Sequence, residues 1–172
     1  YFEENYTTFK ANNVKGLFVQ GYADVPGDFS ELRQYLLAKL LWDASIDVKA
    51  TTADFLRGFY GKAASEIENY LKLLSENQKK SKAYLDIYSG PVQNRTTYLT
   101  PEAMNQYDKF LEKAWQAVDE DKTIQKRVEK LRLALEYTYF EQAKFYGADA
   151  HGLFITNSNG EKIIKEGLNE RV

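Results

Sequence analysis

The sequence predicts a mainly α-helical protein: a bundle-like helical domain preceded by one βα unit. Three observations predict this class. Apolar residues recur at spacings of three and four through most of the chain, as they do in amphipathic helices. One apolar run, Val14–Val19, is too short for a core helix and is typical of a buried strand in a parallel sheet. Hydrophobic residues make up 44% of the 172 residues, which is enough to form a core.

Each predicted helix has its own apolar stripe or capping residue. The first helix carries aromatic residues at helical spacing and stops at Asn13. The second has apolar residues on more than one face, so we expect it to be buried on two sides, with Asp28 or Ser30 as its cap. Thr100 and Pro101 mark the start of another helix. The expected helices cover residues 1–12, residues 29–43, a short stretch after the cap Asp47 that ends at Gly58 or Gly61, residues 62–88, residues 101–118, and a long stretch that ends near Gly147.

The predicted strand Val14–Val19 needs a partner for its backbone hydrogen bonds. Within the chain the candidate is a short strand at Leu153–Thr156, in a tail that also carries a weak terminal helix. Otherwise the strand, the loop at Gln20–Gly27 and the helix after it form one βα unit, which is the end of a larger sheet or barrel. We favour this second interpretation, with the missing strands before Tyr1.

Composition and motifs argue against several classes of function. The net charge of −2 and the pI near 5.6 argue against a nucleic-acid partner, which needs a clustered basic surface. The chain has no cysteine, and His151, its only histidine, has no second histidine with which to share a metal. No phosphate-binding loop or other cofactor motif is present, so we expect neither a metal nor a cofactor. No apolar run approaches the roughly 20 residues of a membrane span.

The loop after the predicted strand carries the candidate binding site. In parallel sheets and barrels, ligands bind beyond the carboxyl ends of the strands. Gln20, Tyr22 and Asp24 lie at that end, and their side chains can hydrogen-bond to a sugar and stack on it. The alternative is that Gln20 and Asp24 only satisfy the loop backbone and cap the next helix. Carboxylate pairs elsewhere fall on polar surfaces, so the sequence identifies no catalytic residue.

Residues 12–74 resemble a bacterial family of glycoside hydrolase-like proteins, domain of unknown function 4838. The matching run is NNVKGLFVQGYADVPGDFSELRQYLLAKLLWDASIDVKATTADFLRGFYGKAASEIENYLKLL. The resemblance rests on the order and spacing of LRxYLLAKLLWD and FxxGFYGxAAxxIxxYLxLL. The family commonly has proline where this chain has Ala44, which affects only the turn. Trp42 and Tyr60, inside the matched motifs, are expected to pack in the core.

The resemblance implies a (β/α)₈ barrel similar to that of α-glucuronidases and β-N-acetylhexosaminidases, followed by a helical domain. Residues 1–45 would then be the last βα unit of the barrel, and residues 46–172 the C-terminal helical domain. It further implies an exported polysaccharide-degrading parent, periplasmic or secreted, whose catalytic carboxylates lie on earlier strands. The partners would be carbohydrate and the missing barrel, and this piece alone would be inactive.

Two functions therefore stay open. In the first, the chain is the C-terminal part of a carbohydrate-degrading barrel enzyme, its helices support the barrel, and the loop of Gln20, Tyr22 and Asp24 lines the sugar cleft. This hypothesis predicts exposed apolar surface on the first βα unit, where the barrel would pack. In the second, the chain is a self-contained helical binding or scaffolding module without catalysis, in which Val14–Val19 pairs with Leu153–Thr156.

Overall fold

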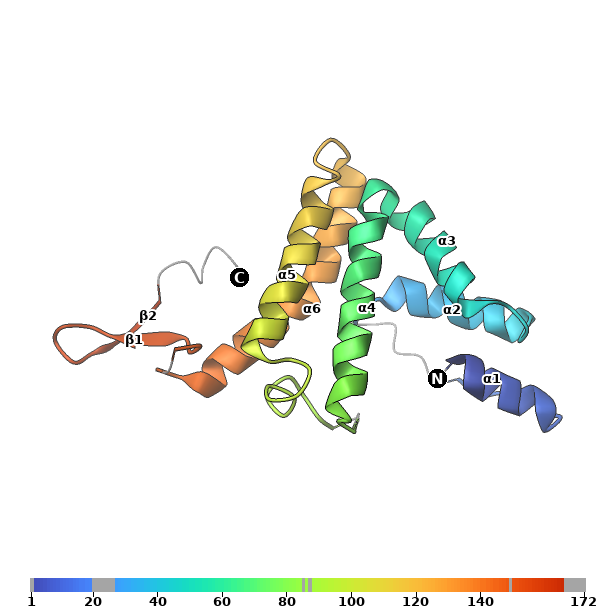
Figure 1. Ribbon diagram of the computed structural model, residues 1–172, viewed down its shortest axis with the longest axis horizontal. Coiled ribbons are helices and arrows are strands. Elements are labelled where there is room, and N and C mark those ends of the chain that lie inside the picture. The colour runs from blue at the N-terminus through green and yellow to red at the C-terminus, as the bar shows by residue number, and fades with distance from the viewer. Residues whose placement is uncertain (1, 20–26, 85, 87, 149, 166–172) are drawn as a thin grey trace.

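The protein is mainly helical, as the sequence predicts. The computed structural model describes residues 2–19, 27–84, 86, 88–148 and 150–165. Within these residues the helices stand in one group, and a small hairpin extends away from them (Figure 1). The elements are α1 (Phe2–Ala11), α2 (Ser30–Trp42), α3 (Val48–Tyr60), the 3₁₀ turn η1 (Gly61–Ala63), α4 (Ala64–Ser81), α5 (Pro101–Gln116), α6 (Lys122–Tyr146), β1 (Phe154–Thr156) and β2 (Lys162–Ile164).

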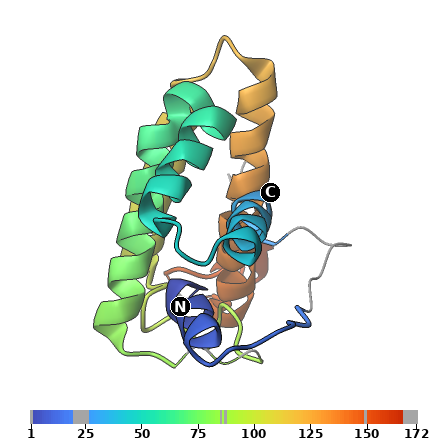
Figure 2. The ribbon, with the colours of Figure 1, turned by 90° about the vertical axis from the view of Figure 1, so that its right-hand side faces the viewer.

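The core lies between α4, α5 and α6, which run side by side, with α3 packed against α4 and α6 (Figures 1 and 2). Each of these helices turns a stripe of apolar residues inward, because its apolar positions recur every three or four residues. Burying these side chains is the main source of the fold's stability. The largest fully buried side chains are Leu40, Leu56, Ile67, Met104, Tyr107, Leu111 and Val128.

One buried tyrosine joins three parts of this core. The Tyr107 hydroxyl on α5 accepts a hydrogen bond from the Asn77 side chain on α4 at 2.9 Å and donates one to the Tyr98 carbonyl at 2.8 Å. Its ring also meets the ring of Tyr70 edge-on, with centroids 5.7 Å apart. The buried hydroxyl is therefore fully satisfied, and it links the linker before α5 to α4.

Three polar residues begin helices as capping chemistry predicts. The Asp47 carboxylate accepts from the backbone N–H of Ala50 at 2.9 Å, and the Thr100 hydroxyl accepts from that of Ala103 at 3.3 Å. Asp121 caps α6 by accepting from two backbone N–H groups, each at 3.0 Å. Each such cap typically contributes about 1 kcal/mol.

The expected strand at Val14–Val19 is not formed. The chain leaves α1 at Asn13, whose left-handed φ of 53° turns the backbone, and residues 14–19 belong to no helix or strand. The side chains expected to be buried are exposed, with Phe18 94% exposed. The physical reason is that no strand in the described part of the chain lies beside this segment to accept its backbone hydrogen bonds.

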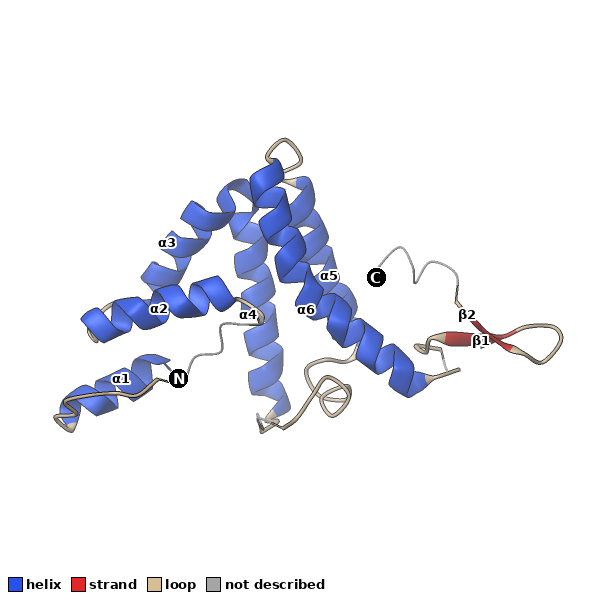
Figure 3. Ribbon diagram, turned by 180° about the vertical axis from the view of Figure 1, so that it is seen from behind, coloured by secondary structure: helices blue, strands red, loops and turns tan. Residues whose placement is uncertain are grey.

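The internal partner considered for that segment pairs elsewhere. β1 forms an antiparallel hairpin with β2, in which Phe154 faces Ile164 and Thr156 faces Lys162. Figure 3 shows the hairpin standing apart from the helices. The strand expected at Leu153–Thr156 is thus present, but its partner is β2 and not Val14–Val19. No helix follows β1 in the described part of the tail, where Lys162–Ile164 form β2, and residues 166–172 lie outside the described residues.

Helix α2 is buried on one face only, contrary to expectation. Leu32, Leu36 and Leu40 point into the core, whereas Leu41 is half exposed and Trp42 is 94% exposed. Trp42 is therefore not a core residue, although Tyr60, for which we made the same prediction, is buried. Helix α2 packs against α1 and α3, and this packing leaves the side chains of Leu41 and Trp42 exposed.

Two other boundaries differ from the prediction. Phe29 occupies the N-cap position of α2 in a left-handed conformation without a side-chain cap, so neither Asp28 nor Ser30 caps this helix. Helix α4 ends at Ser81 and not near residue 88, because Lys82 adopts a left-handed conformation with φ 53°. None of the helices described has the length and apolar character that a membrane span requires.

Candidate functional site

The three residues predicted to contact a ligand, Gln20, Tyr22 and Asp24, lie outside the described residues. The described chain resumes at Gly27, at the end of the same loop. Gly27 and the two residues after it line a pocket.

The pocket lies where the start of α2 meets the C-terminal end of α3 and the middle of α6. Its volume is about 610 Å³, which falls in the range of small-molecule sites. The lining combines aromatic, aliphatic and charged side chains: Gly27, Asp28, Phe29, Glu31, Phe59, Tyr60, Arg127, Lys130, Leu131, Leu133, Ala134 and Tyr137. These residues are far apart in the sequence, and the packing of α6 against α3 brings them together.

Asp28 is the unusual group in this pocket. Its Oδ1 atom is buried and has no hydrogen-bond partner among the described residues. Burial raises the pKa of Asp28 to about 6, although the charge of Arg33 and the backbone N–H of Phe29 act in the opposite direction. A buried carboxyl oxygen without a donor is costly, since most buried polar atoms in proteins are paired. Such a group in a cleft is a candidate functional residue.

A second carboxylate, Glu31, lines the same pocket in a different electrostatic state. Burial alone would raise its pKa, but hydrogen bonds from Lys130, from its own backbone N–H and from Ser30 bring the pKa below its usual value. Lys130 on α6 forms an ion pair with Glu31 across the pocket. Two carboxylates with pKa values displaced in opposite directions therefore share one cavity, an arrangement suited to hydrogen bonding and proton exchange with a ligand.

The remaining pocket charges are already engaged. The Arg127 guanidinium donates to the Phe59 carbonyl at 2.6 Å and lies over the Phe59 ring, 4.3 Å from its centroid. Burial, together with the charges of Glu31 and Asp28, raises the pKa of Tyr60, so its hydroxyl stays protonated. Asp28 and Glu31 offset Arg127 and Lys130, and the pocket lining carries no net formal charge.

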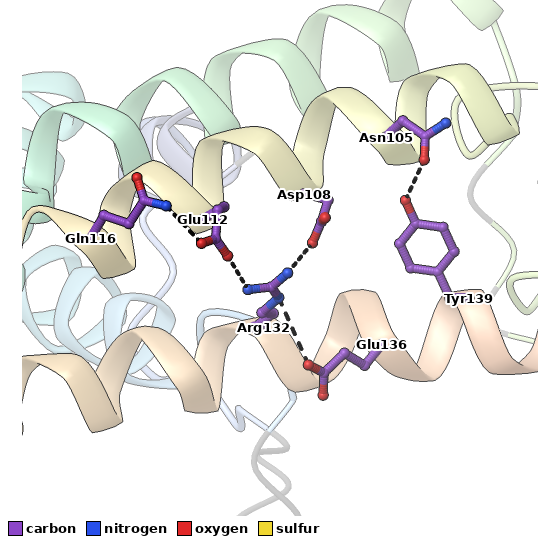
Figure 4. A network of polar contacts seen from close by, with 7 residues as sticks. All are labelled: Asn105, Asp108, Glu112, Gln116, Arg132, Glu136 and Tyr139. Atoms are coloured by element: carbon purple, nitrogen blue, oxygen red, sulfur yellow. Dashed lines mark hydrogen bonds and ion pairs between the residues drawn. The ribbon is translucent and has the colours of Figure 1, made fainter. Parts of the chain in front are cut away.

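A larger polar network joins α5 to α6 (Figure 4). Arg132 on α6 donates to Asp108 at 2.7 Å and to Glu112 at 2.9 Å, and its Nε lies 3.8 Å from Glu136. Gln116 donates to the same Glu112 at 2.8 Å. Each of these groups has a partner within the network, so we interpret it as a clamp between two helices and not as a ligand site.

His151 lies in the turn before β1, with its ring 5.7 Å from that of Tyr146. No group of three or more His, Asp or Glu side chains that could hold a metal ion occurs within the described ranges. The interpretation of this histidine as a structural or surface residue stays a prediction.

A second feature with functional meaning is an exposed apolar surface at the N-terminal end of the fold. We define the N-terminal apolar surface as six residues that are each at least 40% exposed: Val14, Leu17, Phe18, Val19, Leu41 and Trp42. Leu41 and Trp42 lie at the C-terminal end of α2, whereas Val14, Leu17, Phe18 and Val19 lie in the segment that follows α1 and turns back from the end of that helix (Figure 3). Lys10 near the end of α1 is among the groups that lower the pKa of Asp43 after α2, behind the hydrogen bonds from Ser45.

Comparison with known proteins finds a family match, which covers the first part of this chain. Residues 1–72 match the model of a family described as Domain of unknown function (DUF4838). The match spans α1, α2 and α3 and ends within α4, and it covers residues 12–72 of the 12–74 run that suggested this family from the sequence. No protein with a curated function and no solved structure matches the chain. The match to this family thus covers the apolar surface and the Asp28 side of the pocket.

Proposed function

We propose that this chain is the C-terminal, helical part of a carbohydrate-degrading enzyme with a (β/α)₈ barrel, and that its helices support the barrel. The observation that carries the proposal is the N-terminal apolar surface. It lies on the residues that the sequence predicts to be the last βα unit of such a barrel.

The exposure of this surface is energetically unfavourable for a chain that stands alone. Phe18 and Trp42 are each 94% exposed, and burying one large apolar side chain contributes about 2–3 kcal/mol. Exposed large apolar side chains mark an interaction surface where they gather into one patch. A barrel packed against α2 would bury them, and it would supply the second buried face that the leucine pattern of α2 predicts.

The backbone before α2 supports the same proposal. Residues 14–19 are apolar apart from Lys15 and Gly16, and they belong to no helix or strand. Within the described residues, the one backbone hydrogen bond of this segment is that from the Val14 N–H to the Phe9 carbonyl, at 3.1 Å. Unpaired N–H and C=O groups of this kind are a template for pairing with a neighbouring strand. In the barrel, that neighbour would be the preceding parallel strand.

In this arrangement the loop with Gln20, Tyr22 and Asp24 would follow a barrel strand and reach the rim of the sugar cleft. These residues would bind substrate, and the acid and base carboxylates would come from earlier strands. We further propose that the parent enzyme is periplasmic or secreted, because its polymeric substrate lies outside the cell. The chain by itself would then be inactive.

The alternative function, a self-contained helical binding module, requires an internal partner for Val14–Val19. The expected partner, Leu153–Thr156, is occupied by β2 through the pairing of residues 154–156 with 162–164. One observation favours a binding role even so: the 610 Å³ pocket at Asp28 is formed within this chain. Binding at this pocket and support of a barrel are compatible with each other.

Hydroxyl-radical footprinting tests the proposed docking. The native protein, isolated from its source with an antibody against this chain, is compared with the 172-residue chain. We expect Phe18 and Trp42 to react in the isolated chain and to be protected in the native protein. Tyr84 and Tyr88, which are exposed away from the surface in question, serve as matched controls and should react equally in both. Equal reactivity of Phe18 and Trp42 in both proteins would contradict the docking.

The carbohydrate part of the proposal has its own test. The native protein and the 172-residue chain are incubated with a panel of polysaccharides, and the release of reducing sugar is measured. We expect release by the native protein only. Hydrolysis by the isolated chain would show that the catalytic groups lie within it, and the absence of hydrolysis by the native protein across the panel would count against an enzyme of this class.

A further inference from the structure

We propose that the pocket between α2, α3 and α6 is a binding site for a neutral pyranose sugar, with Asp28 as its polar anchor. The site would be an additional sugar subsite, formed by the helical domain and distinct from the barrel cleft. The inference deepens the proposed carbohydrate function and rests on it. Its physical basis is the hydrogen-bonding, charge and shape of the pocket.

The first argument is the unpaired acceptor. Asp28 Oδ1 is buried and receives no hydrogen bond from the part of the chain that the structure describes. A buried acceptor of this kind is stabilised when a ligand supplies a hydrogen bond. Both cations of the lining already have partners, since Arg127 donates to the Phe59 carbonyl and Lys130 pairs with Glu31. The pocket therefore selects a ligand that brings its own donor, such as a hydroxyl group.

The second argument is charge. The two carboxylates and the two cations of the lining cancel, and both cations have partners. An anionic ligand would be repelled by the Asp28 carboxylate and would unbalance a lining whose formal charges cancel. A cationic ligand would have to disturb the Glu31–Lys130 pair or leave its charge poorly solvated against an apolar wall. A neutral ligand avoids both costs.

The third argument is shape and surface. Most of the pocket wall is apolar, and it includes the aromatic side chains Phe59 and Tyr137 and the aliphatic Leu133. Tyr137 and Leu133 are 59% and 60% exposed, so they form an accessible side of the pocket on α6. A pyranose ring has one face of C–H groups, which packs on aromatic rings, and an edge of hydroxyl donors, which suits Asp28.

The position of the pocket links it to the predicted cleft. Gly27, Asp28 and Phe29 follow directly on the loop that carries Gln20, Tyr22 and Asp24. In a barrel, this loop and the start of the next helix lie on the face where substrate binds. A saccharide chain that leaves the barrel cleft toward the helical domain would thus arrive at the Asp28 pocket.

The test uses NMR titration of the ¹⁵N-labelled 172-residue chain with the methyl glycosides of glucose, galactose, mannose and N-acetylglucosamine. Glucuronic acid is the charged control, and cyclohexanol is the apolar control. We expect at least one neutral glycoside to bind with a dissociation constant in the millimolar range or below and to shift the amide signals of Phe59, Tyr60 and residues 130–137. Glucuronic acid should bind at least tenfold more weakly.

Three variants make this result specific. Asp28→Leu removes the acceptor and should weaken glycoside binding at least tenfold, and Tyr137→Ala removes part of the stacking wall and should weaken it severalfold. Tyr84→Ala, on an exposed tyrosine outside the pocket, should leave the affinity unchanged. Far-UV circular dichroism of each variant confirms that it is folded. Asp28→Leu replaces a buried charge by an apolar side chain, so we expect it to fold.

The proposal is overturned if no glycoside shifts the pocket signals, if cyclohexanol alone does so, or if Asp28→Leu binds as tightly as the wild type. Such a failure is distinguishable from a failure of the proposed function, because the titration needs no barrel. Protection of Phe18 and Trp42 in the native protein would stand whether or not the pocket binds a sugar.

Discussion

Replacing Asp28 by asparagine should stabilise this protein at neutral pH. The buried carboxyl has a pKa of about 6 in the folded chain, against 3.8 for an ordinary aspartate. Between these two values the folded state holds more protons than the unfolded state. The free energy of unfolding therefore falls as the pH rises through that window, and the stability that protonation provides is fully present only below about pH 3.8.

The size of the effect follows from the two values. A separation of about 2.2 pH units, at about 1.36 kcal/mol per unit, corresponds to a loss of about 3 kcal/mol when the carboxyl is fully ionised. Asparagine has nearly the same shape and does not ionise. We expect the stability advantage of Asp28→Asn over the wild type to grow by about 2 kcal/mol between pH 4.5 and pH 8, and most of that growth to occur below pH 7.

Urea denaturation followed by far-UV circular dichroism measures this difference at each pH. Comparing the two proteins at the same pH cancels the titration of groups that they share, which include Glu31 and the buried Tyr60 and Tyr70. Asp119→Asn, at an exposed position on the turn before α6, is the matched control and should follow the wild type across the range. A difference between Asp28→Asn and the wild type that does not vary with pH would refute the reasoning.

Three further predictions concern the core, the clamp and the apolar surface. Tyr107→Phe should lower the free energy of unfolding in urea by about 1–3 kcal/mol, because the Asn77 amide and the Tyr98 carbonyl lose their buried partner; a change below 0.5 kcal/mol would contradict that role. Arg132→Met should lower the free energy of unfolding by about 1–2 kcal/mol in low salt, and by less in 1 M salt, because its three carboxylate partners are left to repel each other near the surface. A decrease that does not depend on salt would count against an electrostatic clamp. Trp42→Ser should change the free energy of unfolding by less than about 0.5 kcal/mol, because the indole is exposed. In sedimentation velocity, the variant should self-associate less than the unmodified chain. A large destabilisation would mean that the indole is packed.

The helical part of the fold could be predicted because its signals are local. Apolar spacing and the caps at Asp47, Thr100 and Asp121 identify helices without knowledge of their neighbours. Val14–Val19 shows the limit of such reasoning, because a strand exists only where another strand accepts its hydrogen bonds. The same limit applies to Trp42, whose pattern predicts burial but whose side chain no element of the described residues covers.

The pocket could not be predicted, since it depends on which helices meet. Asp28 looks like a helix cap in the sequence, and Lys130 and Tyr137 look like ordinary exposed residues of an amphipathic helix. Only the packing of α6 against α3 and the start of α2 brings them around one cavity. One signal was available in the sequence: Asp28 lies between a glycine and a phenylalanine at the end of the predicted ligand loop.

The central claim is that this chain supports a larger barrel, and the size of the native protein tests it most directly. An immunoblot of an extract of the source cells and of their culture medium, probed with an antibody against this chain, measures that size. We predict a species several hundred residues longer than this chain, whose catalytic carboxylates would then be sought before Tyr1. A species near 19.9 kDa, the mass of the chain itself, would contradict the claim and leave binding at the Asp28 pocket as the function to pursue.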